Sequence, residues 1–445
     1  MGATEPLARF IADSRYDDLS PEAVEAAKVG IMDGVANMLA GSTQPLAAII
    51  ASYLDEMGGT PVCSVVGWGF LTNAPSAAFA NGVFGHCLDF ELQGFPPTHG
   101  TSSCLPAALA LAEQTGASGR TVILAYVLGW EVQGRLRSAS AAAAAPAYHP
   151  PGLVGPMGGA AAGASVLGLD TEQTRMALGI AASRTGGLTA NTGTMVKSTH
   201  PGNASRMGAE AAILARSGFT SNPDVLEVRY GYADALFRGE MEWDTVTGGL
   251  GDSYRIADPG FDIKRFPAQI TMQRPIESVL NLRQAYGFSP DDVEQLTVEV
   301  RGQGHSGPIP TSGLDGKFSI EYCAAAALLD GGVNIETFTD QRRFSPDMEA
   351  MLPRVSVSPR DSDSARATAQ LRNGRTVSEE CLHFRGSAAN PMSREERLSK
   401  FRYCAGHSLS DQDSECLVGL LERLETVDDV SSLMDLMRKR PPANR

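Results

Sequence analysis

Apolar residues recur at intervals of three and four along the first 250 residues, which is the period of an amphipathic helix. One start signal is Ser20-Pro21, because serine caps helices and proline is favoured in the first turn. The apolar series that follows it consists of Val24, Ala27, Ile31, Val35 and Met38. A second start signal is Asp170-Thr171-Glu172-Gln173, which has the pattern of a capping box. The pattern predicts a bundle of closely packed helices.

After about residue 255 the apolar and polar positions alternate, which is typical of half-buried strands. The alternating positions are Leu296, Val298 and Val300, and then Val355 and Val357. Further along, Asn373-Gly374 separates two short apolar runs, and this dipeptide is a strong hairpin signal. From Ser410 onward the helical spacing returns.

These changes of pattern predict a mainly α fold with two domains. We expect a large all-helical domain over residues 1–255, completed by a C-terminal helical segment over residues 396–445. A smaller α+β lid domain is expected over residues 256–395. The length of 445 residues suits two or three domains better than a single core.

Composition narrows the classes of function. The net charge of −14 disfavours binding to nucleic acid or to an anionic membrane surface, because both need a basic face. The longest apolar run, residues 121–130, is about half of the ~20 residues that a membrane span needs. The first residues lack the basic and apolar regions of a signal peptide, and the seven cysteines are scattered without CxxC spacing. We therefore expect a cytoplasmic protein without a disulfide framework or structural zinc.

Histidines in breaker-rich segments are the first candidates for chemistry. Imidazole titrates near neutrality and suits proton transfer, and loops often carry functional groups. Three of the seven histidines, His99, His149 and His200, stand beside proline or glycine in such segments. His86 lies three residues before Asp89, a spacing that offers two metal ligands on one helix face, but no third ligand is evident nearby. We therefore expect no metal.

Lysine is scarce, with six residues against 31 arginines. Three of the six, Lys197, Lys264 and Lys317, fall in segments with the character of functional loops. An ammonium group can bind a carboxylate as a compact charge, or lose its proton when it is desolvated. The overall negative charge does not exclude an anionic small substrate, because a pocket needs only a few local cations.

Several segments, in order, resemble the MmgE/PrpD family. In the helical part they are residues 81–90 with Thr98-His99, then His149-Pro150-Pro151-Gly152, then residues 177–183, and then Met195-Val196-Lys197 with His200-Pro201-Gly202. In the smaller domain they are Lys264-Arg265-Phe266-Pro267-Ala268 and Phe318-Ser319-Ile320-Glu321-Tyr322. The resemblance extends from about residue 6 to residue 440. Two differences bear on the substrate: Gln93 stands where cis-aconitate decarboxylases carry threonine, and Gln269 and Gln273 stand where many members carry histidine.

The resemblance implies a helical domain with an α+β lid, usually in a homodimer, and an active site between the domains that needs no metal or organic cofactor. Family activities include 2-methylcitrate dehydratase, cis-aconitate decarboxylase and iminodisuccinate epimerase. The catalytic candidates are Asp89, His99, His149 and Tyr322. The candidates for binding the carboxylates of the substrate are Lys197, His200, Lys264, Arg265 and Arg274.

Four classes of function remain open on these grounds. The first is a cofactor-independent lyase that abstracts a proton next to a carboxylate of a small di- or tricarboxylic acid, as dehydratases and decarboxylases of this kind do. The second is an epimerase of a dicarboxylate such as iminodisuccinate, which returns the proton on the opposite face. The third is a non-catalytic helical binding protein, which has no need for the histidine and lysine loops. A metal-dependent hydrolase is a further alternative.

Overall fold

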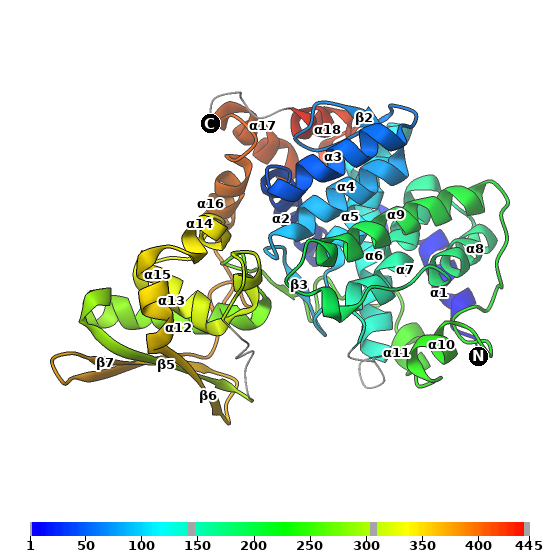
Figure 1. The fold of residues 1–445 in the computed structure, drawn as a ribbon. Helices are drawn as coiled ribbons and strands as arrows, with labels where there is room; N and C mark the ends of the chain where they lie inside the picture. Colours follow the sequence, from blue (N-terminus) through cyan, green and yellow to red (C-terminus); the bar gives the residue numbers. More distant parts are fainter. Residues whose placement is uncertain (1, 141–146, 303–308, 440–445) are drawn as a thin grey trace.

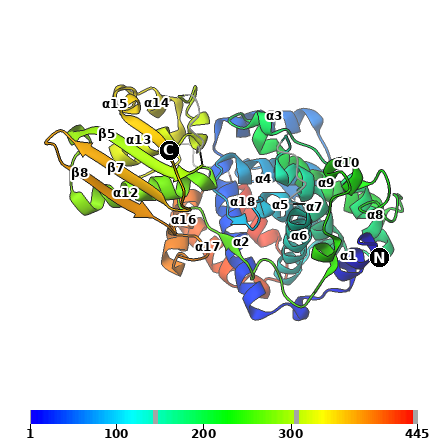
Figure 2. The same ribbon diagram turned by 90° about the horizontal axis from the view of Figure 1, so that it is seen from below.

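The computed structural model describes residues 2–140, 147–302 and 309–439. The described chain forms a large helical domain and a smaller α+β domain that projects from it (Figure 1). In the view from below, the sheet of the smaller domain lies at the far side from the N-terminus (Figure 2). The mainly α fold expected from the sequence pattern is confirmed.

The helical domain contains the following helices: α1 (Thr4–Asp13), α2 (Pro21–Gly41), α3 (Pro45–Met57), α4 (Ala74–Cys87), α5 (Gly100–Thr115), α6 (Gly119–Ala139), α7 (Pro150–Leu167), α8 (Thr171–Ala182), α9 (Val196–Arg216), α10 (Tyr232–Phe237) and α11 (Trp243–Thr247). Short strands accompany them: β1 (Cys63–Ser64) with β2 (Leu71–Thr72), and β3 (Gln93–Gly94) with β4 (Phe261–Asp262). Both start signals function as expected. The Ser20 hydroxyl accepts from Ala23 N–H at 3.2 Å, and Asp170 with Gln173 forms a capping box.

Small residues bring α4 and α9 into close contact. A Cβ atom on Gly82 would lie 2.8 Å from Gly202 Cα, and a Cβ atom on Gly202 would lie 2.9 Å from Phe79 O. Neither position has room for a side chain, so the two helices approach to backbone contact. The approach lies one helical turn before His86 on α4 and close to Lys197 on α9, and it brings these two side chains within reach of each other.

The α+β domain has a four-stranded sheet in the order β6-β5-β7-β8, with β6 parallel to β5 and the other pairs antiparallel. The strands are β5 (Val293–Arg301), β6 (Val355–Arg360), β7 (Ala365–Leu371) and β8 (Thr376–Cys381). The domain's helices are α12 (Gln273–Tyr286), α13 (Ile320–Asp330), α14 (Asp340–Arg343) and α15 (Pro346–Met351). The hairpin turn falls at Asn373-Gly374, where Gly374 has φ of 86°, a value that favours glycine. Apolar residues of α12 and α13 form one core with the buried positions of the sheet.

The chain then returns to the helical domain through α16 (Arg394–Ala405), α17 (Asp411–Glu422) and α18 (Ser431–Arg438). Leu398 and Phe401 of α16 belong to the same buried core as Ile31 of α2. The seven cysteines are free. Among the helices of the described residues, none is long and apolar enough to cross a membrane.

Candidate active site

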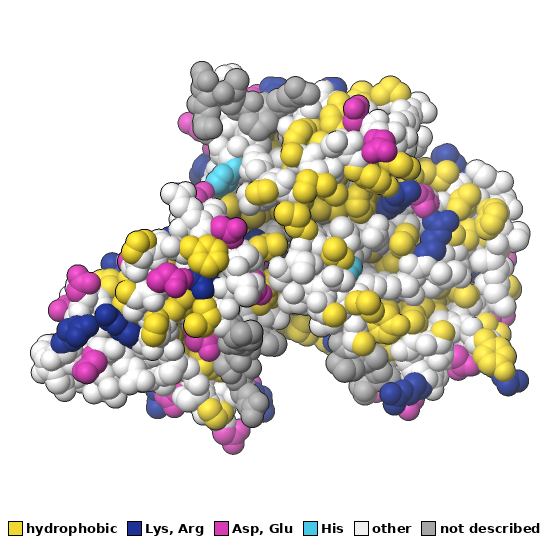
Figure 3. Space-filling model, in the orientation of Figure 1, with side chains coloured by type: hydrophobic (Ala, Val, Ile, Leu, Met, Phe, Trp, Pro, Cys, Tyr) yellow, Lys and Arg dark blue, Asp and Glu magenta, His cyan; other side chains and the backbone are white. Residues whose placement is uncertain are grey.

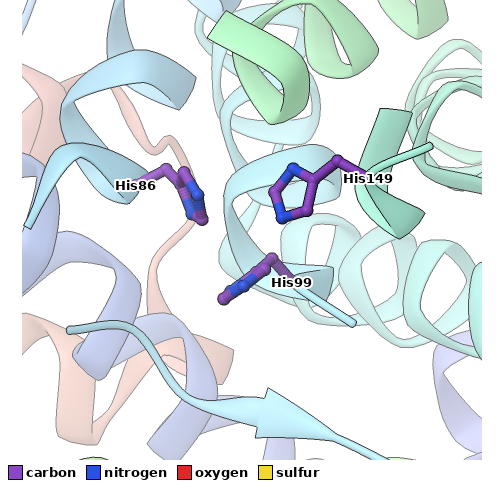
Figure 4. Close-up of side chains that lie close together, drawn as sticks. All are labelled: His86, His99 and His149. Atoms are coloured by element: carbon purple, nitrogen blue, oxygen red, sulfur yellow. The ribbon is translucent and has the colours of Figure 1, made fainter. Parts of the chain in front are cut away.

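The candidate site is built at the ends of helices. His86 lies in the last turn of α4, and His99 and His149 are the N-cap residues directly before α5 and α7. Lys197 and His200 lie at the start of α9. The rings of His86, His99 and His149 lie close together (Figure 4), with ring centroids 4.4 Å apart for the first pair and 5.8 Å for the other two pairs. The N-termini of α5, α7 and α9 therefore lie beside the histidines, where their helix dipoles favour an anion.

Asp89 lies between two lysines from distant parts of the chain. Its carboxylate forms ion pairs with the ammonium groups of Lys197 and Lys264, and Lys264 Nζ also donates to Asp89 O at 2.8 Å. Burial by itself would raise the pKa of the Asp89 carboxyl, but the two ammonium groups hold it well below its usual value. Asp89 also has φ of 52°, in the left-handed region that is uncommon for residues other than glycine. This conformation belongs to a tightly held turn directly after α4.

Lys264 reaches the site because a short strand pair guides it there. Gln93 of β3 pairs with Asp262 of β4, which places the segment after Asp262 next to the turn that carries Asp89. Lys264 is fully buried, and burial lowers the pKa of its ammonium group while Asp89 opposes that shift. Gln273 fixes the following backbone: its side-chain oxygen accepts from Arg265 N–H at 3.0 Å and from Phe266 N–H at 3.1 Å. In this chain Gln273 therefore has a structural role.

The histidines are held in the neutral form. Burial, with the nearby Lys197 charge, lowers the pKa of His86 to about 3. Burial also lowers the pKa of His99, and burial with the Lys197 charge holds the pKa of His149 well below its usual value. The pKa of His200 is lowered by the same two causes. His149 Nδ1 lies 3.1 Å from His200 Nδ1, so one of the two nitrogens donates to the other. Neutral imidazoles can accept protons, which is the form that a general base needs.

Two residues that the sequence did not single out, Glu91 and Lys400, complete the site together with Lys317. Glu91 is fully buried beside His86 and His99. Lys317 of the α+β domain donates to Cys87 O at 2.9 Å, and burial lowers the pKa of its ammonium group to about 8. Lys400 of α16 donates to Phe90 O at 2.8 Å and forms an ion pair of 2.6 Å with Asp33. The scarcity of lysine was a usable signal, because four of the six lysines surround the turn at residues 87–90.

Three of the residues selected from the sequence lie outside this cluster. The Tyr322 hydroxyl donates to Thr337 O at 2.5 Å inside the core of the α+β domain, so the structure does not bring it to the histidines. The Arg265 side chain is 46% exposed and lies 3.5 Å from Glu277. Arg274 donates to Leu382 O at 2.9 Å at the surface. Sequence proximity to Lys264 and to the family segments suggested these residues, but each side chain has a partner in its own domain.

The three imidazoles could also hold a divalent cation. One ring nitrogen from each of His86, His99 and His149 lies within 4.8 Å of the others, and neutral imidazole is the ligand form. The Lys197 ammonium group opposes a cation, because its Nζ lies 3.2 Å from His86 Nε2, whereas the nearby Glu91 carboxylate favours one. The expectation of a metal-free site stays a prediction.

Comparisons with known proteins place the chain in a family. The MmgE/PrpD N-terminal domain model matches residues 5–244, and the MmgE/PrpD C-terminal domain model matches residues 266–426. The chain is 30% identical to the cis-aconitate decarboxylase of Homo sapiens over 99% of this chain and 95% of that protein. It is 29% identical to the enzyme of the same name from Mus musculus, over 98% and 93%, and 25% identical to that from Aspergillus terreus, over 98% and 96%. The chain therefore belongs to the MmgE/PrpD family.

Proposed function

We propose that this protein is a cofactor-independent lyase that acts on a small di- or tricarboxylic acid, with cis-aconitate as the first substrate to test. One observation carries the proposal. Two buried ammonium groups, from Lys197 and Lys264, meet at one carboxylate directly beside a group of neutral imidazoles. This arrangement supplies both anion binding and proton transfer in one place.

The charges favour an anionic ligand that competes with Asp89. Without a ligand, the single charge of the Asp89 carboxylate is shared between the ammonium groups of Lys197 and Lys264. A substrate carboxylate that binds beside the imidazoles can share these ammonium groups, and the N-termini of α5, α7 and α9 add favourable dipoles. Because the groups are buried, each interaction is stronger than it would be in water.

The chemistry of decarboxylation fits this set of groups. When the bond between carbon and a carboxylate breaks, CO2 leaves and its electron pair remains on the substrate. A conjugated carboxylate can take up that charge if cations stabilise it, and we assign this task to Lys197 and Lys264. A proton must then reach carbon, and the Lys197 ammonium can deliver it, or His99 or His149 can do so after taking up a proton from solvent. In dehydration a neutral imidazole instead removes the proton, and an acid protonates the departing hydroxyl.

The names of the relatives favour decarboxylation among the family activities. The enzymes from Homo sapiens, Mus musculus and Aspergillus terreus are all named cis-aconitate decarboxylase, which supports a lyase over the epimerase alternative.

Gln93 is the first residue to examine for substrate choice, because it is buried and its Oε1 has no hydrogen-bond partner among the described residues.

The test is a direct assay in D2O. The purified protein is incubated with cis-aconitate and a panel of other di- and tricarboxylates, while released CO2 and the 1H NMR spectrum are followed. We expect CO2, or a new alkene, with deuterium incorporated at carbon. Exchange with inversion and no new alkene would identify an epimerase instead. If the protein binds acids of the panel but converts none of them, the non-catalytic binding protein is the remaining alternative.

A matched pair of lysine variants links the assay to the site. Lys197→Met removes a buried ammonium group that contacts Asp89, whereas Lys439→Met removes one of the exposed ion pairs, with Asp413. We expect Lys197→Met to lose both turnover and calorimetric binding of the substrate, and Lys439→Met to retain both. Equal activity in the two variants would remove Lys197 from the site.

We further propose that the protein is a cytoplasmic homodimer, with α3 in the interface. Ile49, Tyr53 and Met57 recur every four residues on α3 and are 59%, 37% and 59% exposed. Figure 3 shows hydrophobic side chains gathered over this part of the helical domain. Ile49→Glu should lower the mass measured by light scattering after size-exclusion chromatography, whereas Leu382→Glu, an exposed leucine of the α+β domain, should not. A monomeric native protein would contradict the proposed homodimer. Cell fractionation tests the proposed cytoplasmic location.

A further inference from the structure

Glu91 is a buried carboxylate that contacts several donors and lies outside the set of groups assigned to the reaction above. Its Oε2 accepts from Ser102 N–H at 2.9 Å, and its Oε1 accepts from the Ser102 hydroxyl at 2.6 Å. The same Oε1 lies 2.7 Å from His86 Nδ1 and 3.3 Å from His99 Nδ1. Burial by itself would raise the pKa of Glu91, but the contacts with His86 and His99 hold it well below its usual value. Glu91 is therefore an ionised acceptor.

An ionised carboxylate determines where the proton lies on a neighbouring imidazole. Because it can only accept hydrogen bonds, the ring nitrogen that faces it must carry the hydrogen. His86 Nδ1 faces Glu91 at 2.7 Å, so Nδ1 is the protonated nitrogen of this neutral ring. His86 Nε2 is then an acceptor, and it faces the Lys197 ammonium group at 3.2 Å.

These hydrogen bonds form a continuous series that ends at the proposed substrate site. Glu91 accepts from His86, His86 accepts from Lys197, and Lys197 donates to Asp89. If the proton moved to His86 Nε2, that N–H would point at an ammonium group, and neither partner could accept. Lys197 would lose one of its two buried acceptors and the orientation that they give it.

We propose that Glu91 is a positioning residue, which holds His86 in the tautomer with the proton on Nδ1 and thereby orients the Lys197 ammonium group toward the substrate site. The role of Lys197 in turnover rests on the proposed function, but the tautomer of His86 does not. His99 is under the same influence to a lesser degree, because its Nδ1 is 3.3 Å from Glu91 without the alignment of a hydrogen bond.

The chain contains a matched control for Glu91. Glu113 accepts from Ser64 N–H at 2.8 Å and from the Ser64 hydroxyl at 2.5 Å, which is the same pair of bonds that Glu91 has with Ser102. The contacts of Glu113 do not include the histidines of the site. Replacing either glutamate by methionine keeps the length of the side chain and removes the acceptor. Effects that appear only at Glu91 therefore report on the imidazoles and not on the serine bonds.

The test is 15N NMR of the full-length protein labelled at its histidine rings, with the His86 signals assigned by comparison with His86→Asn. In the native protein we expect the shifts of a neutral ring protonated at Nδ1 and unprotonated at Nε2. In Glu91→Met these shifts should change to those of a ring protonated at Nε2 or of a mixture, while Glu91→Asp and Glu113→Met keep the native pattern. A native His86 protonated at Nε2 would overturn the proposal even if Glu91→Met does not fold. Unchanged shifts in a folded Glu91→Met would do the same.

Kinetics then separate positioning from a purely structural effect. We expect kcat of Glu91→Met to fall about 10²-fold with little change in KM, and Glu91→Asp to recover most of that loss. The titratable groups around His86 are Glu91, Asp89, Lys197, His99 and His149. Loss of the Glu91 charge should therefore also shift the acidic limb of the pH profile to lower pH. An unchanged profile and kcat, with an altered tautomer, would show that the tautomer does not affect Lys197 and would overturn the positioning role. If the native protein turns over none of the tested acids, the NMR result still decides the tautomer.

Discussion

Asp89 and Lys264 form a buried ion pair that joins the end of α4 to the segment leading into the α+β domain. Lys264 Nζ also donates to the backbone oxygen of Asp89, so one side chain holds both the carboxylate and the unusual backbone of this turn. The pair therefore has two functions in the proposed site. It balances charge beside the imidazoles, and it anchors the connection between the two domains.

Removal of Lys264 should cost more stability than removal of an exposed lysine. In Lys264→Met the Asp89 carboxylate stays buried with only Lys197 as an ionic partner, and broken buried pairs typically cost about 3–5 kcal/mol. Urea denaturation followed by circular dichroism measures this loss. Lys439→Met, at an exposed pair, should change the free energy of unfolding by less than about 1 kcal/mol. Similar small losses in both variants would contradict the anchoring role of Lys264.

His99 and His149 should be needed for turnover but not for folding. His99→Asn and His149→Asn should each reduce kcat by ~10²–10⁴-fold, because general acid–base catalysis contributes that much. The thermal unfolding curves should stay close to that of the native protein. His407→Asn, in the ring pair with Tyr403 on α16, provides a histidine control away from the site. Native-like turnover in both His99→Asn and His149→Asn would remove these imidazoles from the mechanism.

The stability of the protein should fall steadily with acid. Burial and the Lys197 charge lower the pKa of His86 to about 3, so between pH 6.5 and pH 3 the unfolded chain binds a proton there that the folded chain does not. Stability thus rises with pH through this window. Asp89 has a lowered pKa as well, so its contribution is present above pH 3.8 and is lost below it. In His86→Asn the slope of the free energy of unfolding between pH 4 and pH 6 should decrease, and an unchanged slope would show that His86 does not cause it.

Tyr322 should be structural rather than catalytic. Its hydroxyl donates to Thr337 O inside the core of the α+β domain, away from the histidines. Tyr322→Phe should therefore keep native kcat and KM and lose about 1 kcal/mol of stability from the missing bond. A large fall in kcat with native stability would restore the role that the sequence suggested.

Chelation tests the expectation of a cofactor-free enzyme. Activity after dialysis against EDTA should equal activity before it, and elemental analysis should find no stoichiometric metal. Three neutral imidazoles are nevertheless able to bind zinc, so micromolar Zn²⁺ should inhibit if it displaces the Lys197 contact with His86. Loss of activity on chelation, with recovery when one metal is returned, would contradict the expectation.

Much of the fold can be predicted from the sequence, because interactions between neighbouring residues determine where many helices and turns begin. The cap at Ser20, the capping box at Asp170 and the turn at Asn373-Gly374 depend on neighbouring residues, and the structure shows each of them where the pattern predicts it. The alternating apolar positions likewise identify β5, in which they form the buried face, and β6.

What only the tertiary structure decided is which side chains share the buried space. Histidines and lysines could be selected as candidates from their residue types and surroundings, but the contact between Lys264 and Asp89 spans 175 residues of sequence. Glu91 went unnoticed because its role comes from its neighbours, and a carboxylate in a polar segment has no distinctive local pattern. Conversely, Arg265 and Arg274 lie close to Lys264 in the sequence, but their side chains contact Glu277 and Leu382 instead of the site. Sequence specifies the groups and the helices that carry them, whereas packing determines which charges must neutralise one another out of water.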